Sequence, residues 1–140
     1  MSFSRFSGQG PSFVPAYQVS GVPFVTSSAS AEVTTSAPIK ISFPTVTRWV
    51  QVRNNGANSL RVGFTEHGVK GTETANFYLL SPSTAASGHT QATTDRWEVR
   101  CKEIFVMAQG GTTGFSLMAG LTGVVQFPVV TGSNGFGGVG

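Results

Sequence analysis

The feature that most constrains the fold of this chain is a series of short segments in which apolar and polar residues alternate. Clear examples are residues 39–43, 60–64 and 97–101. Side chains of a β-strand point alternately to its two faces, so each segment can cover a core with one face only. Strands of this kind need a second sheet to pack against. Because no segment has a convincing helical pattern, the sequence predicts an all-β fold with two packed sheets.

The alternating segments predict eight short strands between residues 31 and 130. The connections between them carry residues typical of turns, such as 54–58, 68–71 and 110–111. Eight short antiparallel strands in a domain of this size favour a single jelly roll, in which two Greek keys form two four-stranded sheets. The predicted strands are 31–36 with 38–43 (counted as one strand bent at Pro38), 47–54, 60–65, 75–80, 95–101, 103–108, 113–119 and 123–130.

The chain divides into three zones. Residues 1–30 are rich in Ser, Gly, Pro and aromatic residues and predict an extended N-terminal arm, and residues 31–130 form the jelly-roll domain. Residues 131–140 predict a flexible Gly-rich tail. The aromatic spacing in the arm predicts rings that dock into pockets elsewhere; the alternative is that the arm packs along its own domain. With the predicted strands all beyond residue 30, removal of residues 1–25 is expected to leave a folded sandwich.

The composition favours a protein whose surface is covered by neighbours. The 140 residues suit one domain, and only 11% of them are charged, well below the usual quarter or so. Interface cores are depleted in charged residues. The net charge is +3, but the arginines alternate with apolar residues along predicted strands and do not form a basic stripe. We therefore expect a solvated or interfacial sheet face and no direct contact with nucleic acid.

No residue pattern indicates catalysis, a metal or a cofactor. Residues 135–140 match a Gly-x-Gly-x-x-Gly pattern but lack the following helix that a dinucleotide site needs. His67 and His89 have no further ligands at metal-binding spacing. Cys101 is the only cysteine and shares a predicted strand face with Trp97, so we expect a buried, reduced and unreactive thiol. We also expect no enzyme activity, no secretory signal and no membrane span.

Several short blocks of the sequence, in order, resemble the penton proteins of large nucleocytoplasmic DNA viruses, those of chloroviruses and their relatives in particular. The resemblance extends over residues 45–125, outside the arm and the tail. The blocks are RWVQVRN at 48–54, LRVGFT at 60–65, GVKG at 68–71, VRCKEIF at 99–105 and AGLT at 119–122.

The resemblance implies a single jelly roll that stands vertically and forms a homopentamer at each icosahedral vertex. Its neighbours would be trimers of a double jelly-roll major capsid protein and minor capsid proteins. The location implied is the virion vertex, after assembly in the cytoplasm of the host cell. The family has no catalytic residues to carry over, and this chain lacks the inserted domain of some pentons, so a fibre or receptor role is not implied.

Candidate interface residues are the aromatic residues of the arm and the Arg and Trp residues of two predicted strands. Arg and Trp are enriched at interface hot spots, and a buried arginine needs a partner. We therefore expect Arg48, Arg53 and Arg100 to meet carboxylates or backbone carbonyls, within a subunit or across the ring. The full set is Phe3, Phe6, Phe13, Tyr17, Arg48, Trp49, Arg53, Arg96 and Arg100.

Two other binding functions fit parts of the sequence. A carbohydrate- or receptor-binding β-sandwich would need a concave aromatic patch, for which only Trp49 and Trp97 are available. A nucleic-acid-binding capsid protein of a small virus would have a densely basic arm, whereas residues 1–30 contain Arg5 as their only basic residue.

Overall fold

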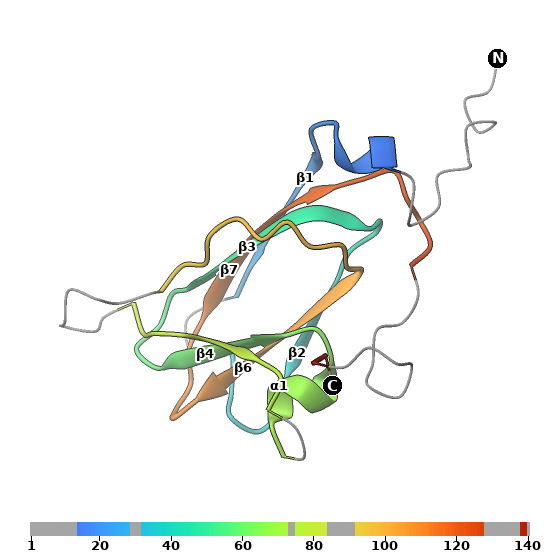
Figure 1. The fold of residues 1–140 in the computed structure, drawn as a ribbon. Helices are drawn as coiled ribbons and strands as arrows, with labels where there is room; N and C mark the ends of the chain where they lie inside the picture. Colours follow the sequence, from blue (N-terminus) through green and yellow to red (C-terminus); the bar gives the residue numbers. More distant parts are fainter. Residues whose placement is uncertain (1–13, 29–31, 73–74, 84–91, 128–137, 140) are drawn as a thin grey trace.

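The protein consists of two antiparallel β-sheets that pack face to face (Figure 1). The computed structural model describes residues 14–28, 32–72, 75–83, 92–127 and 138–139. Helical structure in these residues is limited to the four-residue 3-10 helix η2 (Val14–Tyr17) and the five-residue helix α1 (Glu66–Lys70). The prediction of an all-β fold is therefore confirmed for the described part of the chain.

The first sheet has the strand order β1-β7-β3, and the second has the order β2-β6-β4-β5. All neighbouring strands in both sheets are antiparallel. The strands are β1 (Val22–Ser27), β2 (Ile39–Ser42), β3 (Thr47–Asn54), β4 (Ser59–Gly63), β5 (Tyr78–Leu80), β6 (Glu103–Gln109) and β7 (Phe115–Leu121).

The core lies between the sheets and is built from the alternating apolar residues. Val50 and Val52 of β3 are fully buried, as are Ile104 and Val106 of β6. Between these core positions, β3 presents polar residues such as Gln51 to the outer face of its sheet. The period-two pattern therefore fixes the pairing register of the strands, because a shift by one residue would turn these core side chains toward the solvent.

Strand β6 is buried on its second face as well. There Phe105 and Met107 pack with Val69 of α1 into a smaller apolar cluster. The sequence predicted only a turn at residues 68–71. A one-turn helix forms instead, because the Thr65 side chain accepts a hydrogen bond from the Gly68 N–H and Gly71 ends the helix in the left-handed conformation (φ 70°).

Residues 92–101 lie along the free edge of β3 as an irregular strand. Backbone hydrogen bonds join Val50 to Trp97 in both directions at 2.9 and 2.8 Å, and Thr94 N–H donates to Val52 O. Side-chain hydroxyls replace other ladder bonds: Thr94 Oγ1 accepts from Val52 N–H, and Thr47 Oγ1 accepts from Cys101 N–H. The strand predicted at 95–101 is thus in the right place but irregular, because hydroxyl groups compete with the backbone ladder.

The predicted boundary of the arm at residue 30 is wrong for residues 22–27. They form β1, which pairs with β7 from Val22↔Leu121 to Ser27↔Ser116. The prolines of this zone suggested irregular structure, but Pro23 lies on an edge strand, where a missing N–H is tolerated. By contrast, the strand predicted at residues 31–36 is reduced to the isolated bridge Val33↔Thr113.

Further differences concern the end of the chain. The strand predicted at residues 123–130 is absent from its described part, where Val124 is buried and accepts a hydrogen bond from Val46 N–H. Most of the predicted flexible tail lies outside the described residues. Its residue Val139 accepts a hydrogen bond from Thr65 Oγ1 at 2.6 Å, which places the C-terminal end beside α1 (Figure 1).

Aromatic pairs close the two open sides of the sandwich. On one side Phe24 of β1 meets Phe43, which follows β2, in an edge-to-face contact at 5.1 Å. On the other side Trp97 meets Tyr78 of β5 at 5.3 Å and Phe64 at 6.5 Å. Strand β1 therefore lies over the β2 edge, and residues 92–101 lie over the β5 edge.

The position of β1 changes the expected effect of truncation. We expect a chain lacking residues 1–21 to keep both sheets, whereas a chain lacking residues 1–28 loses β1 and the Phe24–Phe43 contact. Burial of one aromatic side chain stabilises a protein by about 1.5–3 kcal/mol. The longer truncation should therefore be less stable than the shorter one by at least about 2 kcal/mol in urea unfolding. Equal stability of the two truncated chains would contradict the assignment of β1 to the sandwich.

Candidate interaction site

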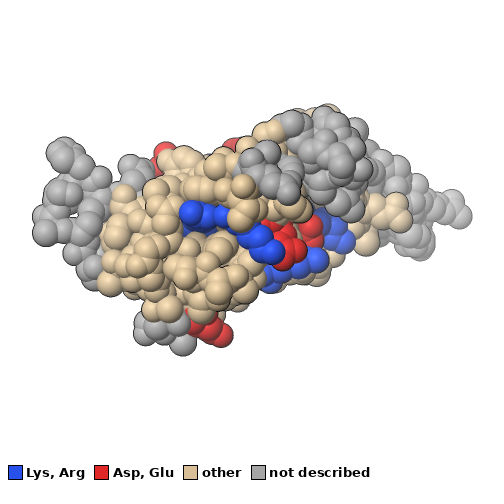
Figure 2. All heavy atoms as spheres, turned by 90° about the horizontal axis from the view of Figure 1, so that it is seen from below, with Lys and Arg blue, Asp and Glu red and all other residues tan. Residues whose placement is uncertain are grey.

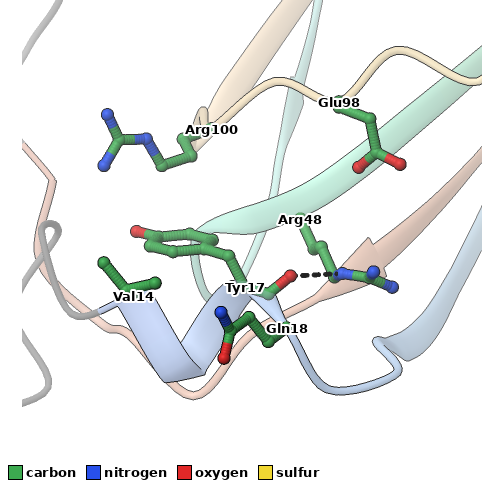
Figure 3. Close-up of a pocket in the computed structure, with 6 residues that line it drawn as sticks. All are labelled: Val14, Tyr17, Gln18, Arg48, Glu98 and Arg100. Carbon is green, nitrogen blue, oxygen red and sulfur yellow. Dashed lines mark hydrogen bonds between the residues drawn. The ribbon is translucent and has the colours of Figure 1, made fainter.

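Three of the predicted interface residues, Tyr17, Arg48 and Arg100, come together in one pocket. It has a volume of about 280 Å³ and lies between η2 and the face formed by β3 and residues 92–101 (Figure 3). Arg48 Nε donates a hydrogen bond to Tyr17 O at 2.6 Å. The guanidinium carbon of Arg100 lies 5.3 Å from the centre of the Tyr17 ring. The remaining lining residues are Val14, Gln18 and Glu98.

These contacts hold the segment that precedes β1 on its own domain. Arg48 meets a backbone carbonyl, as predicted from its sequence position. Arg100 approaches the face of an aromatic ring, a contact worth about 0.5–1 kcal/mol at an exposed site. Arg53 is exposed on β3, and its side chain makes no hydrogen bond or ion pair within the described residues. Within this single chain, Tyr17 therefore packs on its own domain, which was the alternative to docking on another protein. Phe3, Phe6 and Phe13 lie outside the described residues.

Arg96 and Glu98 form an ion pair on the exposed face of residues 92–101. Arg96 Nη2 lies 2.8 Å from Glu98 Oε1, and both side chains are more than half exposed. Such surface pairs contribute about 0–1 kcal/mol. Charges of opposite sign also lie side by side on the face seen in Figure 2, most of which is uncharged. This mixing leaves no basic stripe among the described residues of the kind that binds nucleic acid.

Neither tryptophan forms an open stacking platform. The Trp49 indole lies against Gly120, where an added Cβ would come within 2.3 Å of Nε1, and the Arg96 guanidinium carbon lies 5.9 Å from its ring. Trp97 is enclosed by Phe64 and Tyr78. A sugar-binding patch needs an exposed aromatic face, so these contacts do not favour the carbohydrate-binding alternative.

A second pocket, of about 320 Å³, lies between the edge strands β1 and β2. It contains apolar core residues such as Phe24 and Ile39, with Glu32 and Lys40 at its rim. Lys40 Nζ pairs with Glu103 Oε2 at 3.0 Å. Its lining also includes the hydroxyl residues Thr26, Ser27, Ser28 and Ser42, and it forms a partly open seam between the two sheets.

The histidines and the two short helices provide neither a metal centre nor a membrane span within the described residues. In the described ranges, no three His, Cys, Asp or Glu side chains gather as metal ligands. His67 is exposed on α1, and His89 lies outside those ranges. Neither η2 nor α1 is long enough to cross a bilayer, and the described residues contain no other helix.

Cys101 is buried, with 2% of its surface exposed. Its Sγ lies 3.4 Å from Thr47 Oγ1. Burial in apolar surroundings raises the pKa of the thiol from 9.0 to about 11, although the Thr47 contact partly opposes this shift. The thiolate needed for nucleophilic attack is therefore disfavoured in the folded protein.

We predict that Cys101 reacts slowly with thiol reagents and makes stability fall at high pH. The unfolded state loses the thiol proton near pH 9.0, but the folded state keeps it until about pH 11. Between these values the unfolded state binds fewer protons, so the free energy of unfolding decreases as pH rises. The melting temperature of a Cys101→Ala variant should fall less steeply over this range. Rapid labelling of the native protein at pH 8 would contradict the prediction.

A second prediction concerns the contact between Arg48 and the Tyr17 segment. Arg48→Ala removes a charged donor to a carbonyl, a contact worth about 1.5–3 kcal/mol. Amide hydrogen exchange of residues 14–20 should become faster by about tenfold or more. Arg53→Ala removes the same side-chain type from an exposed position on the same strand and is the matched control. Equal exchange in the two variants would show that Arg48 does not hold this segment.

Comparison with known proteins does not place this chain in a family. No family model matches the sequence, and neither a curated protein nor a solved structure matches the chain. The function must therefore be inferred from the fold and from the contacts described above.

Proposed function

We propose that this chain is a single jelly-roll capsid protein that forms the homopentameric penton at the five-fold vertices of a large double-stranded DNA virus. The observation that carries the proposal is the nested order of strand pairing. Residues 92–101, which lie between β5 and β6 in the sequence, are counted here as the sixth of eight extended segments. The first and last segments, β1 and β7, pair with each other, and so do the second and seventh, β2 and β6. Further inward, β3 pairs with residues 92–101, and β4 pairs with β5.

This nested order supports a jelly roll because it is the pattern of one long hairpin folded over into two sheets. The cross-pairs β3 with β7 and β4 with β6 then join the halves of the hairpin within each sheet. The resulting sheets have four extended segments each, as two Greek keys require. Jelly rolls occur in viral capsid proteins, lectins and cupins, so the fold narrows the function without deciding it.

The surface and the sequence favour the capsid class among these. A cupin-type enzyme would need a cluster of ligands, and a lectin would need an open aromatic platform, neither of which the described residues supply. The low charge of 11% and the exposed apolar side chains suit a protein enclosed by neighbours. The blocks that resemble penton proteins lie mostly on β3, β4, β6 and residues 92–101, within the framework of the sheets.

The proposal includes the partners and the location that the resemblance implies. The chain would contact further copies of itself, trimers of the major capsid protein and minor capsid proteins at the virion vertex, after assembly in the host cytoplasm. It would be structural, with no enzyme activity, no cofactor and no direct contact with nucleic acid.

The oligomeric state tests the proposal. Native mass spectrometry over a concentration series should detect an assembly of five 14.6-kDa chains. In purified particles, density for this chain should lie on the five-fold axes. A chain found only at two-fold or three-fold positions would remove the penton assignment. Binding in a glycan screen that is lost in Trp49→Ala would instead favour the carbohydrate-binding alternative.

A further inference from the structure

Large apolar side chains are exposed at two separate edges of the sandwich. At the first edge, Val22 and Val25 of β1, which point to opposite faces of the strand, are 62% and 65% exposed. Next to this edge, Met118 of the neighbouring strand β7 is 46% exposed. Val25 lies directly opposite Met118 in the strand register, so these two side chains form one continuous apolar surface. At the second edge, Tyr78 and Leu79 of β5 are 49% and 44% exposed.

The same two edges carry no charged residue, unlike the other edge of each sheet. Strand β1 has the sequence VPFVTS and β5 has the sequence YLL. The opposite edge of the first sheet carries Arg96, Glu98 and Arg100, and the opposite edge of the second carries Lys40. Proteins commonly place charges on exposed edge strands to prevent association. Strands β1 and β5 are therefore the edges without a charge, and only Pro23 and the short length of β5 oppose backbone pairing at them.

The two uncharged edges lie on opposite sides of the molecule. The Phe24–Phe43 contact places β1 over the β2 edge, and the Trp97–Tyr78 contact places residues 92–101 over the β5 edge. A contact between β1 of one copy and β5 of another would therefore join two different surfaces. Such a heterologous contact repeats from copy to copy and closes into a ring when its rotation allows.

We propose that the β1 edge, with Val22, Val25 and Met118, packs against the β5 edge, with Tyr78 and Leu79, of a second copy of this chain. The inference deepens the proposed penton function by naming the surfaces of its ring contact. A second copy is the favoured occupant because each chain carries both surfaces and neither β1 nor β5 has a charged side chain. The one charge next to the β5 surface is Arg61, opposite Leu79, and it already donates hydrogen bonds to Gln109 Oε1, Val69 O and Lys70 O. Pro23 removes a backbone donor from β1, so the contact would be made by side-chain packing and not by a continuous strand ladder.

Charge substitutions at the two edges test the inference. The single variants Val25→Lys and Leu79→Lys should each associate at least tenfold more weakly than the wild-type chain, because a lysine would be buried unpaired in the contact. Val125→Lys is the matched control, since Val125 is 60% exposed but lies outside both edges. Sedimentation velocity up to about 1 mM measures association, and far-ultraviolet circular dichroism checks that each variant is folded.

A mixture of the two variants gives a sharper result. The Leu79→Lys chain keeps an intact β1 edge, and the Val25→Lys chain keeps an intact β5 edge, so one contact can form between them. The remaining edges both carry a lysine and repel each other. The mixture should therefore give a 1:1 dimer and no larger species, whereas each variant alone stays monomeric.

The outcomes separate this inference from the penton proposal. Rings with a copy number other than five that respond to both variants would support the edge contact and remove the penton. A five-copy ring that neither variant weakens would support the penton and overturn the edge contact. A wild-type chain that stays monomeric at about 1 mM, or a loss of association in Val125→Lys equal to that in the edge variants, would also overturn the edge contact.

Discussion

The rest of the structure depends on the burial of one face of every strand between the two sheets. The fully buried core residues Val50 and Val52 of β3, and Leu60 and Val62 of β4, alternate with the polar residues Gln51 and Arg61, so no single sheet of this chain could be stable alone. Packing two sheets leaves two open sides, and each is closed by aromatic residues. Phe24 with Phe43, and Trp97 with Tyr78, therefore complete the core that the strands begin.

Two of the scattered arginines, Arg48 and Arg61, attach irregular segments to this core. Arg61 Nη1 donates to Lys70 O at 2.7 Å and Val69 O at 3.2 Å, which satisfies carbonyls at the end of α1, and its guanidinium lies 4.4 Å from the Phe77 ring centre. Arg48 holds the carbonyl of Tyr17 in the same manner. These two arginines therefore have a structural role, because each supplies a donor to carbonyls of an irregular segment.

The distribution of charge over the sheet edges connects stability with the proposed assembly. Edge strands expose backbone groups that can pair with other chains, and charges on them discourage this. In this protein the β2 edge and residues 92–101 carry charges, whereas β1 and β5 carry apolar side chains. If β1 of one copy contacts β5 of the next, every copy is joined to its neighbour in the same head-to-tail orientation. A closed ring is the arrangement that the proposed edge contact would favour.

The sequence by itself determined the all-β class, the core strands near residues 39–43, 47–54 and 60–64, and the burial of Cys101, because these depend on local alternation of side chains. The strand near residues 103–108 was predicted from a short apolar run, because it is buried on both faces. Only the tertiary structure decided that residues 22–27 form a strand, since β1 exists through its pairing with β7, far away in the sequence. The contact of Tyr17 with Arg48 and Arg100 likewise joins distant segments. Local patterns carry no information about such partners, because an edge strand or a docked segment takes its conformation from what it packs against.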